Sequence, residues 1–268
     1  MARVDGLKLV ECGNREGFFI HSIWLNKQNP CQRVPQRFEV FVTSWKKMHP
    51  GDHIVHVVWN GNASDAFFNA YFPSKLAFYK SLPTEVQQCD YLRLLLLYQY
   101  GGMYADIDQQ CNHTFIDSFF NFENEHIILL QSPLFTEEYT NCLMVSLSIR
   151  HQFWLDVAST VEQTVTSIHT GTGLSKTCSF YFNMPLIGQQ IQVLFTNNIT
   201  GPSCIDRTIA HFPHYGCDIY PLSPSEFYNG KYSIHHEYAG WFSSHTVQSV
   251  KRLSLGILFS AIVFLYIR

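Results

Sequence analysis

Residues 89–108 read CDYLRLLLLYQYGGMYADID, and this stretch decides how the chain is expected to fold. The segment 85–100 is rich in leucine and aromatic residues and predicts a buried helix, which the Gly101-Gly102 pair ends at the C-cap. The residues that follow, 103–106, predict a strand. A helix that turns directly into a strand belongs to a βαβ unit, and here the strand ends at an Asp-Ile-Asp triplet.

The same alternation of strand and helix precedes this stretch. Short apolar runs at 20–25 and 54–59 predict strands, and the spacing of large apolar residues over 38–48 predicts a helix between them. Another helical pattern begins at Ser64, a residue type suited to the N-cap. This order predicts an α/β fold: an open, mostly parallel sheet with helices on both faces and ligands at the carboxyl ends of the strands.

Length and composition indicate one folded domain over residues 1–250, because the 268-residue chain has no internal repeat and no Pro/Ser-rich linker. Apolar residues make up 46% and charged residues 15%, which excludes a disordered chain. A net charge of -3 without a long basic run argues against a nucleic-acid partner. The cysteines are scattered and form no C-x-x-C pair, so structural zinc is not expected.

The last residues, 253–268, are expected to form a membrane anchor. They follow Lys251-Arg252 and carry no charge before Arg268. At about 1.5 Å per residue such a helix is slightly short for a bilayer core of about 30 Å, but flanking basic residues can snorkel to both interfaces. The alternative is an amphipathic or buried final helix.

Signals for the side of the membrane conflict. The N-terminus lacks the uninterrupted apolar region of a signal peptide, and the basic pair before the tail weakly favours a cytosolic domain. Glycosylation acceptor triplets at Asn62, Asn112 and Asn198, together with the cysteines, favour a lumenal domain. A single-pass C-terminal anchor is therefore expected, and its orientation stays open.

Asp106 and Asp108 are the candidate metal ligands. Two carboxylates separated by one residue can face the same crevice where a strand frays, and Mg²⁺ and Mn²⁺ bind a few carboxylates together with phosphate oxygens and water. Asp90 and Arg93 lie at i and i+3 on the preceding helix, where a buried arginine normally answers an anionic or hydroxyl-rich ligand or a paired acid. The alternative for this pair is a salt bridge on a wet surface.

The pattern D-x-x-R, apolar helix, Y-G-G-x-Y-x-D-x-D in residues 89–108 resembles the sugar-binding signature of the family 32 glycosyltransferases. Other motifs of that family are resembled along the chain: I-H-x-x-W at 20–24, S-W-x-x-x-x-P at 44–50, H-P-F-W at 151–154, T-G-P at 200–202 and H-H...S-W at 235–241. The departures are Gln152 for the usual proline, Gly240 for the serine before tryptophan, and Gln109-Gln110 where an acidic residue is common. They concern the acceptor side and the metal shell rather than the reaction class.

The resemblance implies a GT-A-like catalytic domain and a role for each matched residue. Asp90, Arg93 and Tyr104 would bind the donor sugar. Asp106 would meet ribose, sugar or metal, and Asp108 would be the direct ligand of Mn²⁺ (or Mg²⁺). Metal and arginine would stabilise the charge that develops on the leaving diphosphate.

Four more residues are candidates on the same grounds. Trp24 would line the nucleobase pocket, where an indole can stack on a base. Trp241 would donate its indole N–H to the diphosphate, or else pack against the tail. His236, with His235 as the alternative, would complete the metal site; in a strand the two rings point to opposite faces, so at most one reaches it.

The reaction implied by the resemblance is retaining transfer of a hexose from a nucleotide-diphosphate sugar to a glycan or glycolipid acceptor. GDP-mannose is the expected donor and a UDP-hexose the alternative, because the resemblance is closest to membrane-bound mannosyltransferases acting on inositol-phosphoceramide, whose usual address is the Golgi or ER membrane. A metal-dependent hydrolase or phosphatase is disfavoured by the absence of further close carboxylates or an H-E-x-x-H motif. A non-catalytic sugar-binding membrane protein is disfavoured by the intact D-x-x-R and D-x-D.

Overall fold

The computed structural model describes residues 3–4, 7–8, 17–51, 53–119, 127–133, 138–170, 196 and 199–236. Its centre is a six-stranded sheet in the order β4-β3-β5-β8-β7-β9. The strands of this sheet are β3 (Phe18–Ile23), β4 (Ile54–Trp59), β5 (Gly102–Ala105), β7 (Ile127–Gln131), β8 (Tyr139–Ser146) and β9 (Ile219–Leu222). Two antiparallel pairs lie outside it, β1 (Arg3–Val4) with β2 (Leu7–Lys8) and β6 (Gln109–Cys111) with β10 (Ser233–His235).

The sheet is mixed. β3 runs parallel to β4 and β5, and β7 runs parallel to β9, whereas β8 is antiparallel to both of its neighbours. The prediction of a mostly parallel sheet therefore needs one correction, at β8. That strand follows β7 after a short connection, and such a connection can only join antiparallel neighbours.

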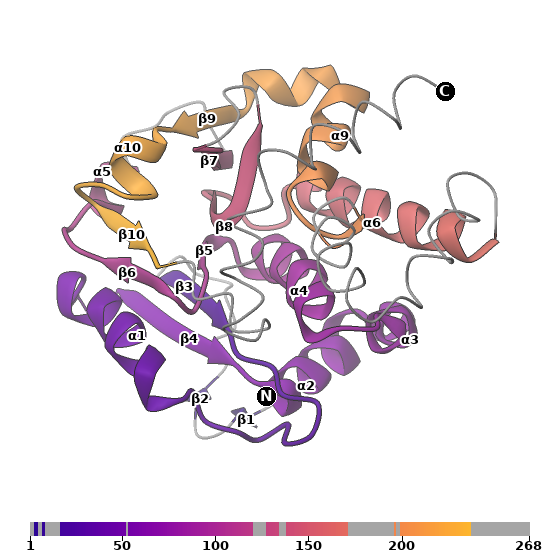
Figure 1. Ribbon diagram of the computed structural model, residues 1–268, viewed down its shortest axis with the longest axis horizontal. Coiled ribbons are helices and arrows are strands. Elements are labelled where there is room, and N and C mark those ends of the chain that lie inside the picture. The colour runs from indigo at the N-terminus through magenta and orange to yellow at the C-terminus, as the bar shows by residue number, and fades with distance from the viewer. Residues whose placement is uncertain are drawn as a thin grey trace, which may run out of the picture.

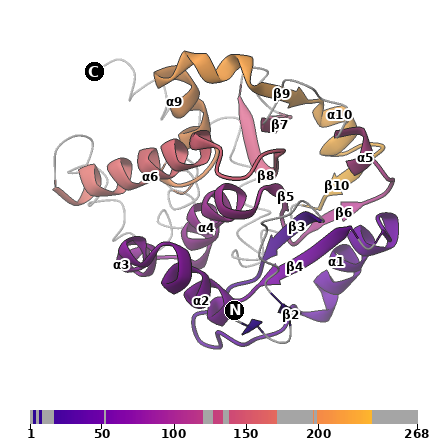
Figure 2. The same cartoon turned by 180° about the vertical axis from the view of Figure 1, so that it is seen from behind.

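Helices cover both faces of the sheet, as the sequence predicted (Figure 1). They are α1 (Gln36–Met48), α2 (Gly61–Tyr71), α3 (Pro73–Ser81), α4 (Glu85–Tyr100), α5 (Ile116–Phe119), α6 (Gln152–Thr170), α9 (Ser203–His211), the 3₁₀ helix η1 (Pro213–Cys217) and α10 (Pro224–Phe227). One apolar core joins α2, α3, α4, α6 and α9 to one face of the sheet, and a second joins α1, α5 and α10 to the other. Figure 2 shows the same division from behind.

Helix α4 has the bounds expected from its local signals. Its N-cap Thr84 accepts a hydrogen bond from the Gln87 amide at 3.2 Å, and its C-cap Gly101 has a φ of 63°. The four leucines 94–97 are all buried because the helix packs against both the sheet and α6. Such all-round burial explains why this helix shows no polar face in the sequence.

Helix α2 begins earlier than predicted. Asn60, not Ser64, is its N-cap, and the Asn60 side chain accepts from the Ala63 amide at 2.9 Å. Ser64 lies inside the first turns, where its hydroxyl donates to the Asn60 carbonyl at 2.7 Å. Both residue types suit an N-cap, and the end of β4 at Trp59 decides between them.

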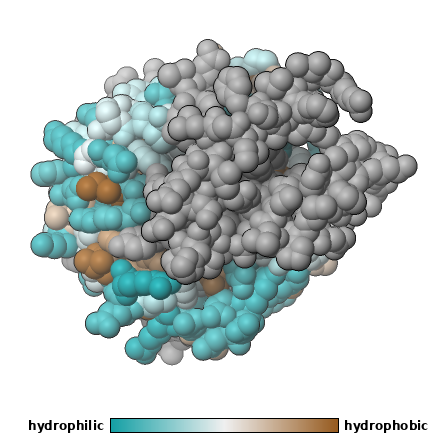
Figure 3. Space-filling model, in the orientation of Figure 1, coloured by the Kyte–Doolittle hydropathy of each residue, from teal (hydrophilic) through white to brown (hydrophobic). Residues whose placement is uncertain are grey.

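Among the described residues no helix is both long and apolar enough to cross a membrane. The expected anchor, 253–268, lies outside the described residues. On the face seen in Figure 3 the described surface is mostly hydrophilic, with separate hydrophobic spots rather than one patch.

We expect Gly102→Ala to destabilise the fold strongly. Gly102 has a φ of 80°, and a Cβ atom there would lie 2.3 Å from the Phe19 carbonyl oxygen on the neighbouring strand β3. Strain from the dihedral and displacement of backbone should together lower the free energy of unfolding by at least about 2 kcal/mol, measured by urea denaturation. Gly216→Ala is the control, because a Cβ there meets nothing within 4 Å. Equal losses in both variants would contradict the close approach at Gly102.

A buried histidine should make stability depend on pH. His21 is fully buried, with Nε2 3.0 Å from the Gly101 carbonyl oxygen, and its Nδ1 accepts from the Trp59 indole at 3.2 Å. Burial lowers the pKa of His21 to about 4. Because the unfolded chain binds this proton near pH 6.5, stability is full above that pH and falls as the pH drops toward 4, by up to about 3 kcal/mol.

The measurement is urea denaturation of the wild type, His21→Gln and His113→Gln between pH 4 and 7.5. His21→Gln should lower stability and flatten its pH dependence, whereas the exposed His113 serves as the control. An unchanged slope in His21→Gln would show that other groups cause the acid sensitivity.

Candidate functional site

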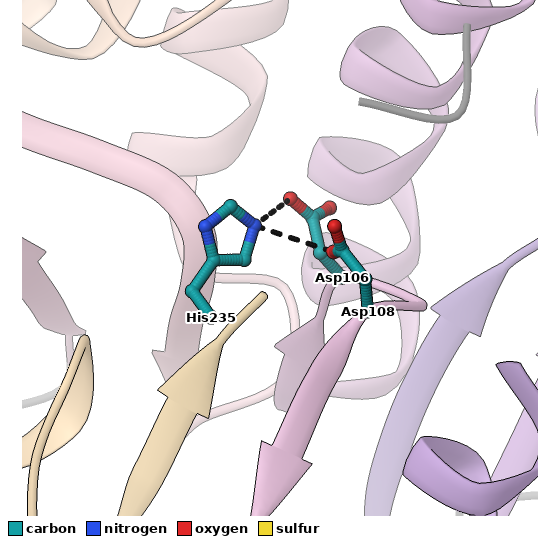
Figure 4. A group of neighbouring side chains, drawn as sticks. All are labelled: Asp106, Asp108 and His235. Carbon is teal, nitrogen blue, oxygen red and sulfur yellow. Dashed lines mark ion pairs between the residues drawn. The ribbon is translucent and has the colours of Figure 1, made fainter. Parts of the chain in front are cut away.

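The Asp-Ile-Asp triplet lies in a tight turn between β5 and β6. The Asp106 amide donates to the Cys142 carbonyl at 2.8 Å, and the Gln109 amide donates to the Asp106 carbonyl at 2.9 Å. This turn brings the carboxylates of Asp106 and Asp108 to the same side, as predicted from the sequence (Figure 4). Helix α1 holds β6, the strand that follows the triplet, because the Trp45 indole donates to the Gln109 carbonyl at 2.8 Å.

His235 reaches the two carboxylates from β10. Its Nε2 lies 3.6 Å from Asp106 Oδ2 and 3.3 Å from Asp108 Oδ1 (Figure 4). One ligand atom from each of the three residues falls within 4.8 Å of the others. Two carboxylate oxygens and an imidazole nitrogen form a donor set that fits Mn²⁺, and Mg²⁺ less well because it prefers oxygen ligands.

His235 lies between the two carboxylates and contacts both. Burial opposes its protonation, but the neighbouring Cys142, Asp106 and Asp108 outweigh burial and raise the pKa of His235 far above its ordinary value. The imidazolium then supplies the positive charge between the carboxylates. Only the neutral imidazole is a metal ligand, so binding of a metal ion by His235 would release a proton.

His236 points elsewhere. Its Nε2 lies 2.8 Å from Gln110 Oε1, and its ring stacks on Phe41 with centroids 4.3 Å apart. Successive side chains of an extended segment point to opposite faces, so the His236 ring is directed away from the ring of His235. His235 itself lies opposite Gln109 of β6. The structure thus brings His235, the alternative choice, to the carboxylates rather than His236.

Asp90 and Arg93 form a buried ion pair behind the triplet. Arg93 Nη2 lies 3.0 Å from Asp90 Oδ1, and the side chains are only 5% and 4% exposed, respectively. This rules out a salt bridge on a wet surface. Arg93 Nη1 also lies 3.3 Å from Asp106 Oδ1, so the pair is linked directly to the triplet.

Tyr104 completes the contacts of Asp106. Its hydroxyl donates to Asp106 Oδ1 at 2.6 Å, and its ring lies 4.4 Å from the guanidinium carbon of Arg93. Burial favours the protonated acid, but Arg93, His235 and Tyr104 outweigh it, and the pKa of Asp106 stays below its ordinary value. Asp106 is thus held ionised.

Two more side chains belong to this network, Asn141 of β8 and Thr200, which both donate to the Asp90 carboxylate. Thr200 stands in the T-G-P turn noted in the sequence, without an assigned role. Nothing in the sequence marks Asn141, which reaches the site only because β8 pairs with β5. A polar residue in a strand beside a predicted site strand is the one signal that could have found it.

Trp24 lines a cavity of about 390 Å³ at the carboxyl ends of β3 and β4. The cavity is lined by Trp24, Gln32, Arg33, Val34, Glu39, Val42, Thr43, Val58 and Asn60. The buried Trp24 Nε1 has no hydrogen-bond partner among the described residues, so a donor is available to a bound group. Trp241, the other candidate tryptophan, lies outside the described residues.

Comparison with known proteins identifies the central region. Residues 35–127 match the family model described as "Glycosyltransferase sugar-binding region containing DXD motif". The chain carries the sugar-binding region of the DXD glycosyltransferases. This DXD region contains Asp90, Arg93, Asp106 and Asp108, whereas His235 lies beyond its end.

Curated relatives of the DXD region are fungal. "Inositol phosphoceramide mannosyltransferase 3" of Schizosaccharomyces pombe is 30% identical over 95 residues, which are 35% of this chain and 25% of that protein. "Putative glycosyltransferase HOC1" of Saccharomyces cerevisiae is 32% identical over 93 residues, 34% of this chain and 22% of that protein. The matches thus span about a quarter of the length of these relatives.

A solved structure supports the fold over a longer stretch. The catalytic domain of alpha-toxin from Clostridium novyi superposes with a TM-score of 0.50 at 11% identity, covering 90% of this chain and 83% of that one. At this identity the likeness concerns the α/β, GT-A-like fold alone.

Proposed function

We propose that the chain is a metal-dependent, retaining glycosyltransferase that moves a hexose from a nucleotide-diphosphate sugar to a glycan or glycolipid acceptor. The observation that carries the proposal is the cluster of Asp106, Asp108 and His235, in which the two aspartates belong to the DXD region and His235 reaches them from β10. This cluster follows β5, while the Trp24 cavity opens at the end of the adjacent parallel strand β3. Ligands of open α/β sheets bind at this edge.

Each part of the site has a chemical task in this proposal. Asp106, Asp108 and His235 would hold Mn²⁺ or Mg²⁺, which when bound neutralises charge on a leaving diphosphate. Arg93 keeps Asp106 ionised and adds a fixed positive charge behind it. Trp24 offers a ring for stacking on the nucleobase and an indole N–H that has no partner in the described part of the chain.

GDP-mannose is the donor we favour. The support is that several of the similar fungal proteins are named inositol phosphoceramide mannosyltransferases. A UDP-hexose is the alternative donor. The acceptor is proposed only as a hydroxyl of a glycan or glycolipid.

A panel of nucleotide sugars tests the proposal. Purified full-length protein is incubated with each donor and Mn²⁺ or EDTA, and the released nucleotide is measured with and without acceptor glycolipid. Mn²⁺-dependent release from GDP-mannose is expected. Release from a UDP-hexose alone would reassign the donor, and cleavage of simple phosphate esters would indicate a hydrolase. Tight donor binding without turnover would indicate a non-catalytic sugar-binding protein.

The membrane anchor at 253–268 is proposed together with this function. Burial of about fifteen apolar residues in lipid contributes several kcal/mol to membrane binding, at about 25 cal/mol per Å². Truncation after Ser249 removes this contribution and should therefore release an active, soluble enzyme. Membrane association of the truncated and full-length chains is measured by sedimentation after a carbonate wash. A truncated chain that still sediments with membranes would place the anchor elsewhere. A mobility shift on glycosidase treatment of the full-length protein would place the domain in a Golgi or ER lumen.

A further inference from the structure

Two side chains from distant parts of the chain hold the Asp90 carboxylate. Thr200 Oγ1 donates to Asp90 Oδ2 at 2.8 Å, and Asn141 Nδ2 donates to Asp90 Oδ1 at 2.9 Å. Arg93 Nη2 also contacts Asp90 Oδ1, at 3.0 Å. Both oxygens of Asp90 are therefore engaged by the protein itself, and this side chain is buried.

The orientation of Asp90 sets that of Arg93. A guanidinium is planar, so fixing two of its nitrogens fixes the whole group. Nη2 is fixed on Asp90, and Nη1 donates to the Asn141 carbonyl oxygen at 2.6 Å. The same Nη1 lies 3.3 Å from Asp106 Oδ1. A rotated Asp90 carboxylate would thus turn the guanidinium and move the charge that faces Asp106.

We propose that Thr200 and Asn141 are positioning residues of the metal site, which orient Asp106 through Asp90 and Arg93. The contacts described for Thr200 and Asn141 reach Asp90 and Arg93 but not Asp106, Asp108 or His235, so each acts through the ion pair. Only the kinetic part of this inference rests on the proposed function, because cation binding can be measured without a donor.

The hydroxyl of Thr200 has an alternative acceptor, which makes the choice of Asp90 informative. The Thr196 carbonyl lies 3.3 Å away and would satisfy the single hydroxyl proton. The shorter, 2.8 Å contact goes instead to a carboxylate, where a charge-assisted hydrogen bond is roughly twice as strong. Burial raises the pKa of Asp90 to about 6, against the opposing effect of Arg93, Thr200 and Asn141. Loss of either donor therefore weakens the ionised form that holds Arg93.

A pair of isosteric variants separates positioning from packing. Thr200→Val removes the hydroxyl that contacts Asp90. Thr208→Val is the control, because Thr208 is also buried and its hydroxyl also donates a hydrogen bond, to the Cys204 carbonyl at 2.8 Å. Mn²⁺ binding to the purified full chain is measured by the EPR signal of free Mn²⁺, alongside thermal unfolding and donor kinetics.

We expect both valine variants to lose similar thermal stability, but only Thr200→Val to weaken Mn²⁺ binding, by about tenfold or more. Its kcat should fall by a similar factor, and Thr200→Ser should restore both Mn²⁺ affinity and kcat. Asn141→Ala should act in the same direction. Its effect combined with Thr200→Val should be less than additive, because both act through one carboxylate.

Equal Mn²⁺ affinity in Thr200→Val and Thr208→Val would overturn the proposal. If Thr200→Val does not fold, the comparison of Asn141→Ala with wild type decides, since it keeps the backbone carbonyl that Arg93 uses. A wild type that binds Mn²⁺ but turns over no donor would refute the proposed function and leave the affinity comparison decisive. A wild type that binds no Mn²⁺ would refute both.

Discussion

Asp108→Asn is expected to abolish metal-dependent turnover while the fold stays intact. The substitution keeps the size of the side chain but removes the negative charge that binds the cation. Asp108 Oδ1 lies 3.3 Å from His235 Nε2, so the variant also weakens the contact that places the histidine. Loss of a cation that stabilises a leaving diphosphate is worth several kcal/mol, which predicts at least about a hundredfold drop in kcat.

The measurement is donor turnover at increasing Mn²⁺ together with Mn²⁺ affinity and thermal unfolding. Asp117→Asn is the control, because that carboxylate is 81% exposed in its contact with His53. The control should keep wild-type values. If Asp108→Asn retains most of its activity at saturating Mn²⁺, Asp108 is not the metal ligand.

The parts of the fold with local signals could be predicted from the sequence. Helix α4 and strand β4 have the predicted bounds, because Gly101 ends the helix and an apolar run of strand length marks β4. Strand β3 begins and ends earlier than predicted. Its bounds are set by pairing with β4, from Phe18 opposite Ile54 to Ile23 opposite Trp59, and pairing is not a local property.

The antiparallel direction of β8 was missed because no strand was predicted beyond residue 106. Once β7 and β8 are known, their short connection fixes that direction. The choice between His235 and His236 as the metal ligand also could not be made from the sequence, because it depends on how strands pair. Their alternation was predictable, but which ring meets Asp106 depends on the register that sets His235 opposite Gln109. Asp90 and Arg93, by contrast, were correctly placed on one face of α4, because i,i+3 neighbours on a helix lie on one face whatever the fold.

Arg93→Lys is the second change with a large expected effect, because one guanidinium serves several partners at once. Nε donates to the Cys89 carbonyl at 3.2 Å, Nη1 contacts the Asn141 carbonyl and Asp106, and Nη2 contacts Asp90. A lysine ammonium is a single point charge and cannot bridge two carboxylates in a planar fork. One buried carboxylate then loses its partner, which costs about 3–5 kcal/mol when a buried pair is broken.

We therefore expect Arg93→Lys to unfold at markedly lower denaturant concentration and, where it is still folded, to lose at least about a hundredfold in kcat/KM for the donor. Arg93 lowers the pKa of Asp106, so a poorly placed lysine should let that pKa rise and move the acid limb of the pH–activity profile to higher pH. Arg37→Lys is the control, since Arg37 is exposed and contacts only the face of Phe38 among the contacts described for it. A variant with lowered stability but unchanged KM, kcat and acid limb would show that Arg93 only packs the interior. A shifted acid limb would instead tie its charge to the ionisation of Asp106, because loss of packing alone leaves that pKa where it is.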